Sequence, residues 1–186
     1  MKIENSFEVP ASSEEAWALL MDVPRVVPCM PGAKLVETVD DDHWKANMGV
    51  KLGPISLSFD TDIEREEVDE AARRARLGAN AKEKRGRGGA RATIESTLSE
   101  ADGRTRVDIV TDLALSGQVA QYGRGLIADV AGDIVSSFAR CLEAQLEAPP
   151  EKAAALVAAQ AEPVSGIRLG IRSLRRTLAR WIRPRR

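Results

Sequence analysis

Apolar residues recur at nearly every second position between Lys34 and Ser116, and this long region constrains the fold more than any other feature of the chain. In "ISLSFDTDI", which begins at Ile55, every odd position is apolar or threonine and every even position is polar. Successive side chains of a β-strand point to opposite faces, so this alternation predicts strands with one buried face. Turn signals at Leu52–Pro54 and Ala101–Gly103 separate the strands. The region therefore predicts an antiparallel meander of six strands.

The segments before this region predict one further strand and two small helices. "KIENSFEV" alternates in the same way over residues 2–9, and Pro10 ends it. "SSEEAWALL" has Ser12 or Ser13 as a helix N-cap and two glutamates in the first turn. The proline-rich stretch that follows favours turns, with a short helix at "PRVVP".

One long helix is predicted after the meander, from about Val119 to Glu147. Its predicted buried stripe consists of Val119, Tyr122, Leu126, Val130, Ile134 and Cys141. Gly123, Gly125 and Gly132 would each destabilise a helix by about 1 kcal/mol relative to alanine. Either the glycines make room for a close sheet or a bulky ligand, or they reflect ordinary packing of helix on sheet.

A long helix on a strongly bent antiparallel sheet can enclose a cavity. Small residues are expected on the inner face of this sheet, at Ala46, Ala75, Ala79 and Ala92. Unfilled volume between apolar walls typically holds an apolar molecule. The sequence alone leaves open the alternative that helix and sheet pack tightly without a cavity.

Three stretches, in order, resemble the carbon monoxide dehydrogenase CoxG family of the START-like (SRPBCC, helix-grip) superfamily. They are "AWALLMDVPRVVPCMPGAKLVE" (Ala16–Glu37), "LGPISLSFDTDI" with Gly53-Pro54 at its turn, and "GQVAQYGRGLIADVAGDIVSSFARCLEAQL". The resemblance covers about residues 1–147. One departure is the loop Lys82–Arg87, which is more basic than is expected for the family.

This resemblance implies an α+β helix-grip fold, with a bent antiparallel sheet wrapped around a long C-terminal helix and an apolar cavity between them. It also implies association with a carbon monoxide dehydrogenase-type molybdenum hydroxylase, which family members tether to the membrane. A bound prenyl-quinone, menaquinone or ubiquinone, is a plausible extension, since it would accept the electrons of that enzyme. On this basis the residues expected to bind the ligand are Met30, Trp44, Met48, Leu57, Phe59, Leu77, Ile94, Leu113, Tyr122, Leu126, Ile127 and Val130. The mouth of the cavity is expected between the loop Pro28–Ala33, which would be mobile, and Tyr122.

Catalytic chemistry is not indicated by the residue inventory. His43 follows three aspartates, Asp40–Asp42, in what is interpreted as a solvated turn, and no nucleophile motif or phosphate loop is present. We therefore expect a non-enzymatic binding protein without catalytic or metal-binding residues. The alternative is a START-like enzyme of the cyclase or hydrolase type, with Tyr122, Asn47 and Thr111 as its polar groups.

Cys29 and Cys141 are spaced like neither a metal site nor a redox pair, and they are interpreted as two separate small buried residues. No apolar run of signal-peptide length occurs at the N-terminus, and no stretch of about 18 apolar residues could span a bilayer. A reduced, cytoplasmic protein, at the inner face of the cytoplasmic membrane, is expected.

The last 22 residues differ sharply in charge from the rest of the chain. Residues 165–186 carry eight arginines and no acid, whereas the whole chain has a net charge of −1, so the remainder carries −9. On a helical wheel the apolar residues share one sector of about 100° and the arginines lie opposite, which is typical of a helix at a membrane interface. The residues expected to bind the membrane are Ile167, Arg168, Ile171, Arg172, Leu174, Arg175, Arg176, Leu178, Arg180, Trp181, Ile182 and Arg183.

These features predict three parts: a ligand-binding domain over residues 1–147, an Ala/Pro-rich linker over 148–166 and a basic amphipathic helix over 167–186. An anionic membrane surface is the expected partner of the tail. A groove on the partner enzyme, a tail that never folds and nucleic acid are the alternatives, the last disfavoured by the apolar sector.

Overall fold

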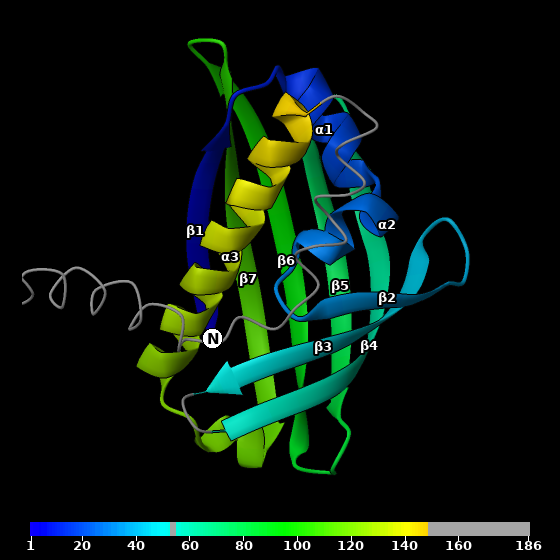
Figure 1. Ribbon diagram of the computed structural model, residues 1–186, viewed down its shortest axis with the longest axis vertical. Helices are drawn as coiled ribbons and strands as arrows, with labels where there is room; N and C mark the ends of the chain where they lie inside the picture. Colours follow the sequence, from blue (N-terminus) through cyan, green and yellow to red (C-terminus); the bar gives the residue numbers. More distant parts are fainter. Residues whose placement is uncertain (53–54, 149–186) are drawn as a thin grey trace, which may run out of the picture.

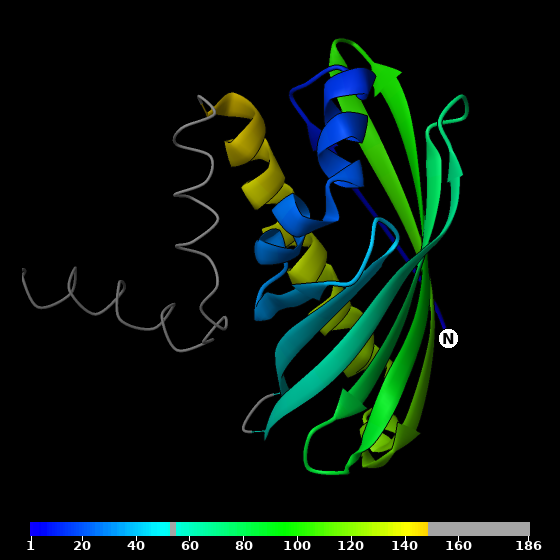
Figure 2. The same ribbon diagram turned by 90° about the vertical axis from the view of Figure 1, so that its right-hand side faces the viewer.

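The computed structural model describes residues 1–52 and 55–148 and contains one curved antiparallel sheet with all its helices on one face (Figures 1 and 2). The strand order across the sheet is β1-β7-β6-β5-β4-β3-β2. The strands are β1 (Lys2–Val9), β2 (Ala33–Thr38), β3 (His43–Leu52), β4 (Ile55–Asp69), β5 (Arg74–Glu83), β6 (Gly88–Ala101) and β7 (Arg104–Gly117). The helices are α1 (Ser13–Met21), α2 (Val23–Val26), η1 (Val27–Cys29), η2 (Gln118–Gln121) and α3 (Arg124–Glu147), where η1 and η2 are 3₁₀-helices. This confirms the α+β helix-grip prediction.

The period-two alternation of the sequence becomes the two faces of the sheet. Along the first half of β4, buried residues alternate with exposed ones, as the pattern predicts. The inner face, toward the helices, carries Leu57, Phe59 and Thr61, and the outer face carries polar residues. β-Bulges interrupt the register between Leu35 and Glu37 and between Arg65 and Glu67.

The helices before the meander form where the sequence predicts them. Ser12 caps α1: its side chain accepts a hydrogen bond from the backbone of Glu15, whose carboxylate in turn accepts from the Ser12 backbone. This reciprocal capping box satisfies two backbone donors at the start of the helix.

The long helix begins at Arg124 and not at Val119. Gly117 adopts a positive φ of 66°, and the backbone amides of Gln118 and Val119 donate to the carbonyl of Arg87. The chain is therefore held against the β5–β6 turn through η2, and Gly123 becomes the N-cap of α3.

Three hydrophobic clusters, rather than one, stabilise the domain. The first joins α1 and the C-terminal half of α3 to β1, β6 and β7, and includes Trp17, Leu98, Val107 and Leu142. The second joins α2 and η1 to β2 and β3 around Trp44. The third joins the β3–β4 hairpin to η2 around Phe59 and Val119. The clusters surround the middle of the inner face.

Cys29 and Cys141 are bonded in a disulfide with an S–S distance of 1.93 Å, so the interpretation of two separate cysteines is wrong. Both are buried, as expected. Their pairing joins η1 to α3 across 112 residues of sequence. Because disulfides persist mainly in oxidising compartments, the cysteines no longer support a reducing location. The predicted amphipathic tail and, except for Ala148, the predicted linker lie outside the described residues.

Candidate ligand site between the sheet and the long helix

The N-terminal half of α3 is less buried than its C-terminal half. All fully buried residues of α3 lie in its C-terminal half, at Phe138, Cys141, Leu142 and Gln145. A Cβ atom built on Gly123, Gly125 or Gly132 would meet no other heavy atom within 4 Å. The glycines therefore do not serve a close approach of the sheet. Leu126, predicted in the buried stripe, is 41% exposed.

The middle of the inner face is only half-buried. Ala79, Ala92 and Leu113 lie side by side on β5, β6 and β7, and all three are only half-buried although they point toward the helix side. They belong to none of the three clusters of the described residues. Ala46 and Ala75, in contrast, are packed in clusters and leave no space. The prediction of unfilled volume thus applies to Ala79 and Ala92 only.

The structure brings the twelve predicted ligand-binding residues to the inner face and to α3, but in different settings. Trp44 and Met30 belong to the second cluster, where the Arg65 guanidinium lies 5.2 Å from the Trp44 ring centre. Leu57, Phe59, Tyr122 and Val130 form part of the third cluster, and Ile94 packs on the first. Those half-buried outside the clusters are Met48, Leu77, Leu113 and Ile127, and Leu126 is exposed.

One polar group on the inner face was missed by sequence reasoning. The Thr61 hydroxyl is buried and has no hydrogen-bond partner among the described residues. In register with it lie Ala46 on β3 and Ala81 on β5, neither of which offers a polar side chain. The strand alternation places Thr61 inside, but only the register reveals that its neighbours are alanines.

The polar residues proposed for an enzymatic alternative do not converge. Tyr122 and Thr111 are half-buried on the inner side. Asn47 lies between Ala46 and Met48 on β3 and therefore faces outward. In the described ranges, no group of three or more His, Cys, Asp or Glu residues is arranged to hold a metal ion.

The loop Pro28–Ala33 is tied down rather than mobile. Cys29 is bonded to α3, and the Gly32 carbonyl accepts a hydrogen bond from the Gly49 amide at 2.8 Å. Gly32 has a φ of 80°, and a side chain here would collide with the Gly49 carbonyl. This loop is therefore held in place at both Cys29 and Gly32.

The basic loop Lys82–Arg87 is organised around the buried carboxylate of Glu83. The Arg87 guanidinium donates to it at 3.0 Å, and the backbone amides of Arg85 and Arg87 donate as well. The hydrogen bond from Arg87 is the main cause that lowers the pKa of Glu83 to about 2. Arg87 also donates to the Ser56 carbonyl and so joins this turn to the β3–β4 hairpin.

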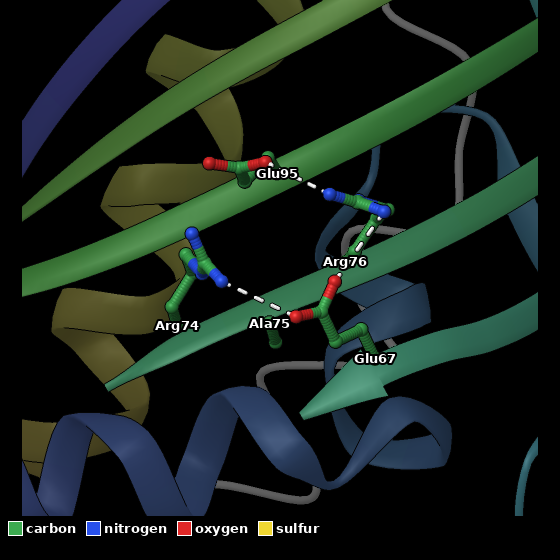
Figure 3. A pocket seen from close by; sticks show the side chains of 5 residues that line it. All are labelled: Glu67, Arg74, Ala75, Arg76 and Glu95. Atoms are coloured by element: carbon green, nitrogen blue, oxygen red, sulfur yellow. Dashed lines mark hydrogen bonds and ion pairs between the residues drawn. The ribbon is translucent and has the colours of Figure 1, made fainter. Parts of the chain in front are cut away.

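The outer face of the sheet is polar. A hollow of about 630 Å³ lies over β3 to β6, and its lining combines polar residues such as Lys45, Asp62 and Arg91 with the apolar residues Trp44, Ile63, Ala79 and Ala92. Beside it, Glu67 pairs with Arg74 and Arg76, and Arg76 with Glu95, across three strands (Figure 3). His43 is exposed, as predicted, but it is the first residue of β3 and not part of the preceding turn; its hydrogen bond with Asp40 raises the pKa of His43.

Within the described parts of the chain, no helix has both the length and the apolar character that a membrane span requires.

Comparison with known proteins gives one family and a set of solved folds. The sequence model of the carbon monoxide dehydrogenase CoxG family matches residues 6–147. No curated protein matches the chain.

Solved structures with the same fold include a conserved protein from Geobacillus kaustophilus, with a TM-score of 0.70 and 24% identity over 78% of this chain and 95% of that one. The Zhui aromatase/cyclase from Streptomyces sp. R1128 has a TM-score of 0.57 and 16% identity, over 79% and 93% of the two chains. A START superfamily protein from Mycobacterium smegmatis has a TM-score of 0.52 and 14% identity, over 78% and 97%. At these identities the likeness concerns the fold alone.

Proposed function

Because the chain belongs to the carbon monoxide dehydrogenase CoxG family, we propose that it is a non-enzymatic carrier of an apolar molecule that serves a carbon monoxide dehydrogenase-type molybdenum hydroxylase at the membrane. One observation carries the binding part of this proposal. The half-buried row Ala79, Ala92 and Leu113 lies between three packed clusters on the helix side of the sheet, and the N-terminal half of α3 is less buried than its C-terminal half.

The chemistry of this region fits a flat or extended apolar ligand with a polar atom. Burial of apolar surface is favourable by about 25 cal/mol per Å², so a ligand that covers the row and Leu77 and Ile127 gains affinity from contact alone. The hydroxyls of Thr61 and Tyr122 can each donate a hydrogen bond, which matches the carbonyl oxygens of a quinone. A prenyl-quinone therefore satisfies both requirements, and in this role it would take up the electrons of the partner enzyme.

The tail completes the proposal. Residues 167–186 would lie in an anionic membrane interface, with their apolar sector in the lipid and their arginines at the headgroups. This places the domain at the cytoplasmic face, where it would hold the hydroxylase near the quinone pool. The family assignment, not the cysteines, supports that location.

The experiment that tests the carrier is mass spectrometry of an organic extract of the purified full-length protein. We expect a co-purified prenyl-quinone in the wild type and its loss in Ala92→Phe, because the ring fills the space above the row. Ala114→Phe is the matched control, since Ala114 is exposed on the opposite face of β7. Extracts without any apolar molecule, or equal amounts from both variants, would contradict the proposal.

An enzymatic role is the competing function, favoured by the inward positions of Tyr122 and Thr111. Turnover of an apolar substrate by the wild type, lost in Tyr122→Phe, would establish it. The carrier is preferred because Asn47 faces away and the other two hydroxyls lie among apolar side chains.

A further inference from the structure

The chain segments at one end of the domain are joined by hydrogen bonds into a single surface. Arg87 bonds the β5–β6 turn to Ser56 beside the β3–β4 hairpin, and its carbonyl accepts from Gln118 in η2. Gly123 and the first turn of α3 follow directly. Figures 1 and 2 both show these segments together at the lower end of the molecule.

This surface carries an excess of exposed cations, and we call it the basic end. Its side chains are Lys51, Lys82, Lys84, Arg85 and Arg124, all exposed. Only Lys84 forms an ion pair within the described residues, with Asp60 at 3.1 Å. The carboxylate of Glu83 does not offset them, because it is buried and neutralised by Arg87. Asp60 and Asp129 are the exposed acids nearby.

The opposite end of the domain has the reverse charge. The β4–β5 and β6–β7 turns and the start of α1 expose several acids, among them Glu14, Glu70, Glu100 and Asp102. Residues 1–164, which comprise the domain and most of the linker, together carry −9. An anionic surface would therefore favour the orientation that presents the basic end.

The basic end also exposes apolar atoms next to the half-buried inner face. Leu126 is 41% exposed, Tyr122 is half-buried, and Gly123 and Gly125 add no side chains between them. Exposed apolar atoms at the same end as exposed cations suit the headgroup boundary of a membrane better than a nucleic acid, which binds the charge alone.

We propose that the basic end docks on an anionic lipid surface and turns the Tyr122 end of the inner face toward the bilayer. This inference rests on the proposed membrane association and adds an orientation to it. A ligand could then move between lipid and the inner face without crossing water.

The length of the linker permits this orientation. The tail follows the far end of α3, whose 24 residues span about 36 Å. Residues 148–166 can extend to about 60 Å, so the tail can reach the same membrane that the basic end contacts.

The test uses the full chain with one surface cysteine labelled by the fluorophore NBD, on vesicles that contain phosphatidylglycerol and headgroup spin-labelled lipid. Gly125→Cys places the label at the basic end in open space, and Ala71→Cys places it on an exposed turn at the opposite end. The native cysteines are paired and buried, so the label is selective. We expect quenching to be several-fold stronger at Gly125→Cys than at Ala71→Cys.

A charge-reversal pair separates this orientation from simple tethering. Lys51→Glu with Arg85→Glu should remove the difference in quenching, whereas Lys2→Glu with Arg104→Glu, which changes net charge equally, should preserve it. Vesicle co-sedimentation measured on the same samples tests the membrane association itself. Co-sedimentation with equal quenching at both sites would overturn the orientation alone, and absence of co-sedimentation would overturn both. A label at Gly125→Cys that responds to the partner hydroxylase but not to vesicles would assign the surface to a protein and also overturn the proposal.

Discussion

Cys29 in η1 and Cys141 in α3 are bonded to each other, and Gln145, one helical turn further along α3, donates its side-chain amide to the Cys29 sulfur at 2.9 Å. The bond fixes the wall formed by α2 and η1 against the well-packed half of α3. A covalent link across 112 residues restricts the unfolded chain strongly, and such links typically stabilise a protein by about 2–4 kcal/mol.

The first prediction follows from this bond. Cys141→Ala, or reduction of the wild type, should lower the free energy of unfolding by about 2–4 kcal/mol. Urea titrations with and without dithiothreitol measure the difference, and thiol titration in denaturant counts the free cysteines. Two free thiols in the untreated protein would show that the bond is absent.

The second prediction concerns pH. Folding lowers the pKa of Glu83 from its ordinary value of 4.5 to about 2. The ionised carboxylate therefore stabilises the fold fully above pH 4.5. That contribution is lost as pH falls from 4.5 to about 2, because the unfolded state takes up the proton first. Glu83→Gln should be less stable than wild type at neutral pH and should lose less stability on acidification. Thermal melts at several pH values test this, with the exposed Asp102→Asn as control. Parallel curves for wild type and Glu83→Gln would contradict it.

A third prediction distinguishes filled from unfilled parts of the inner face. Ala75 is 3% exposed within the first cluster, so Ala75→Phe should cost about 1–3 kcal/mol through overpacking. Ala79 is the next inward-facing residue after Leu77 on β5; it is half-buried and belongs to none of the three clusters. Ala79→Phe should therefore leave the melting temperature nearly unchanged. Equal losses in both variants would mean that the middle of the face is already packed.

The fourth prediction addresses the unpaired hydroxyl. Thr61→Val removes a buried polar group without a partner among the described residues, so the ligand-free protein should be equally stable or up to about 1 kcal/mol more stable. If the hydroxyl donates to a quinone carbonyl, the same variant should retain less quinone. A clear loss of stability in ligand-free protein would show that Thr61 has a partner.

The fifth prediction tests whether tail and domain act together. Trp181→Glu places a charge in the apolar sector of the tail and should weaken binding to anionic vesicles. It should also reduce the quinone recovered from protein made in cells, while quinone supplied in detergent should bind normally. Normal cellular loading with lost vesicle binding would mean that the tail only positions the partner enzyme.

Sequence alone could predict those features that depend on local periodicity. The alternation in β4 and the capping residues of α1 were sufficient to place the strands and the first helix. The same kind of alternation in β3 places Asn47 on the face of the sheet opposite to that of Ala46. The start of α3 was predicted wrongly because it depends on the Arg87 carbonyl, which is distant in sequence. The disulfide and the isolation of the Thr61 hydroxyl were missed for the same reason, since each depends on which residues the fold makes neighbours.

The position of β1 at the edge of the sheet has a consequence for biosynthesis. Lys2 pairs with Asp112, so the first strand to leave the ribosome must wait for 110 further residues before its partner exists. At about 5–20 residues per second, this delay is roughly 5 to 20 s. During this delay, the strand of Ile3, Phe7 and Val9 lacks β7, its neighbour in the sheet. The helix α3, which packs on β1, appears later still. The sheet is therefore complete only once β7 has been synthesised, and β1 is the strand that waits longest for its partner.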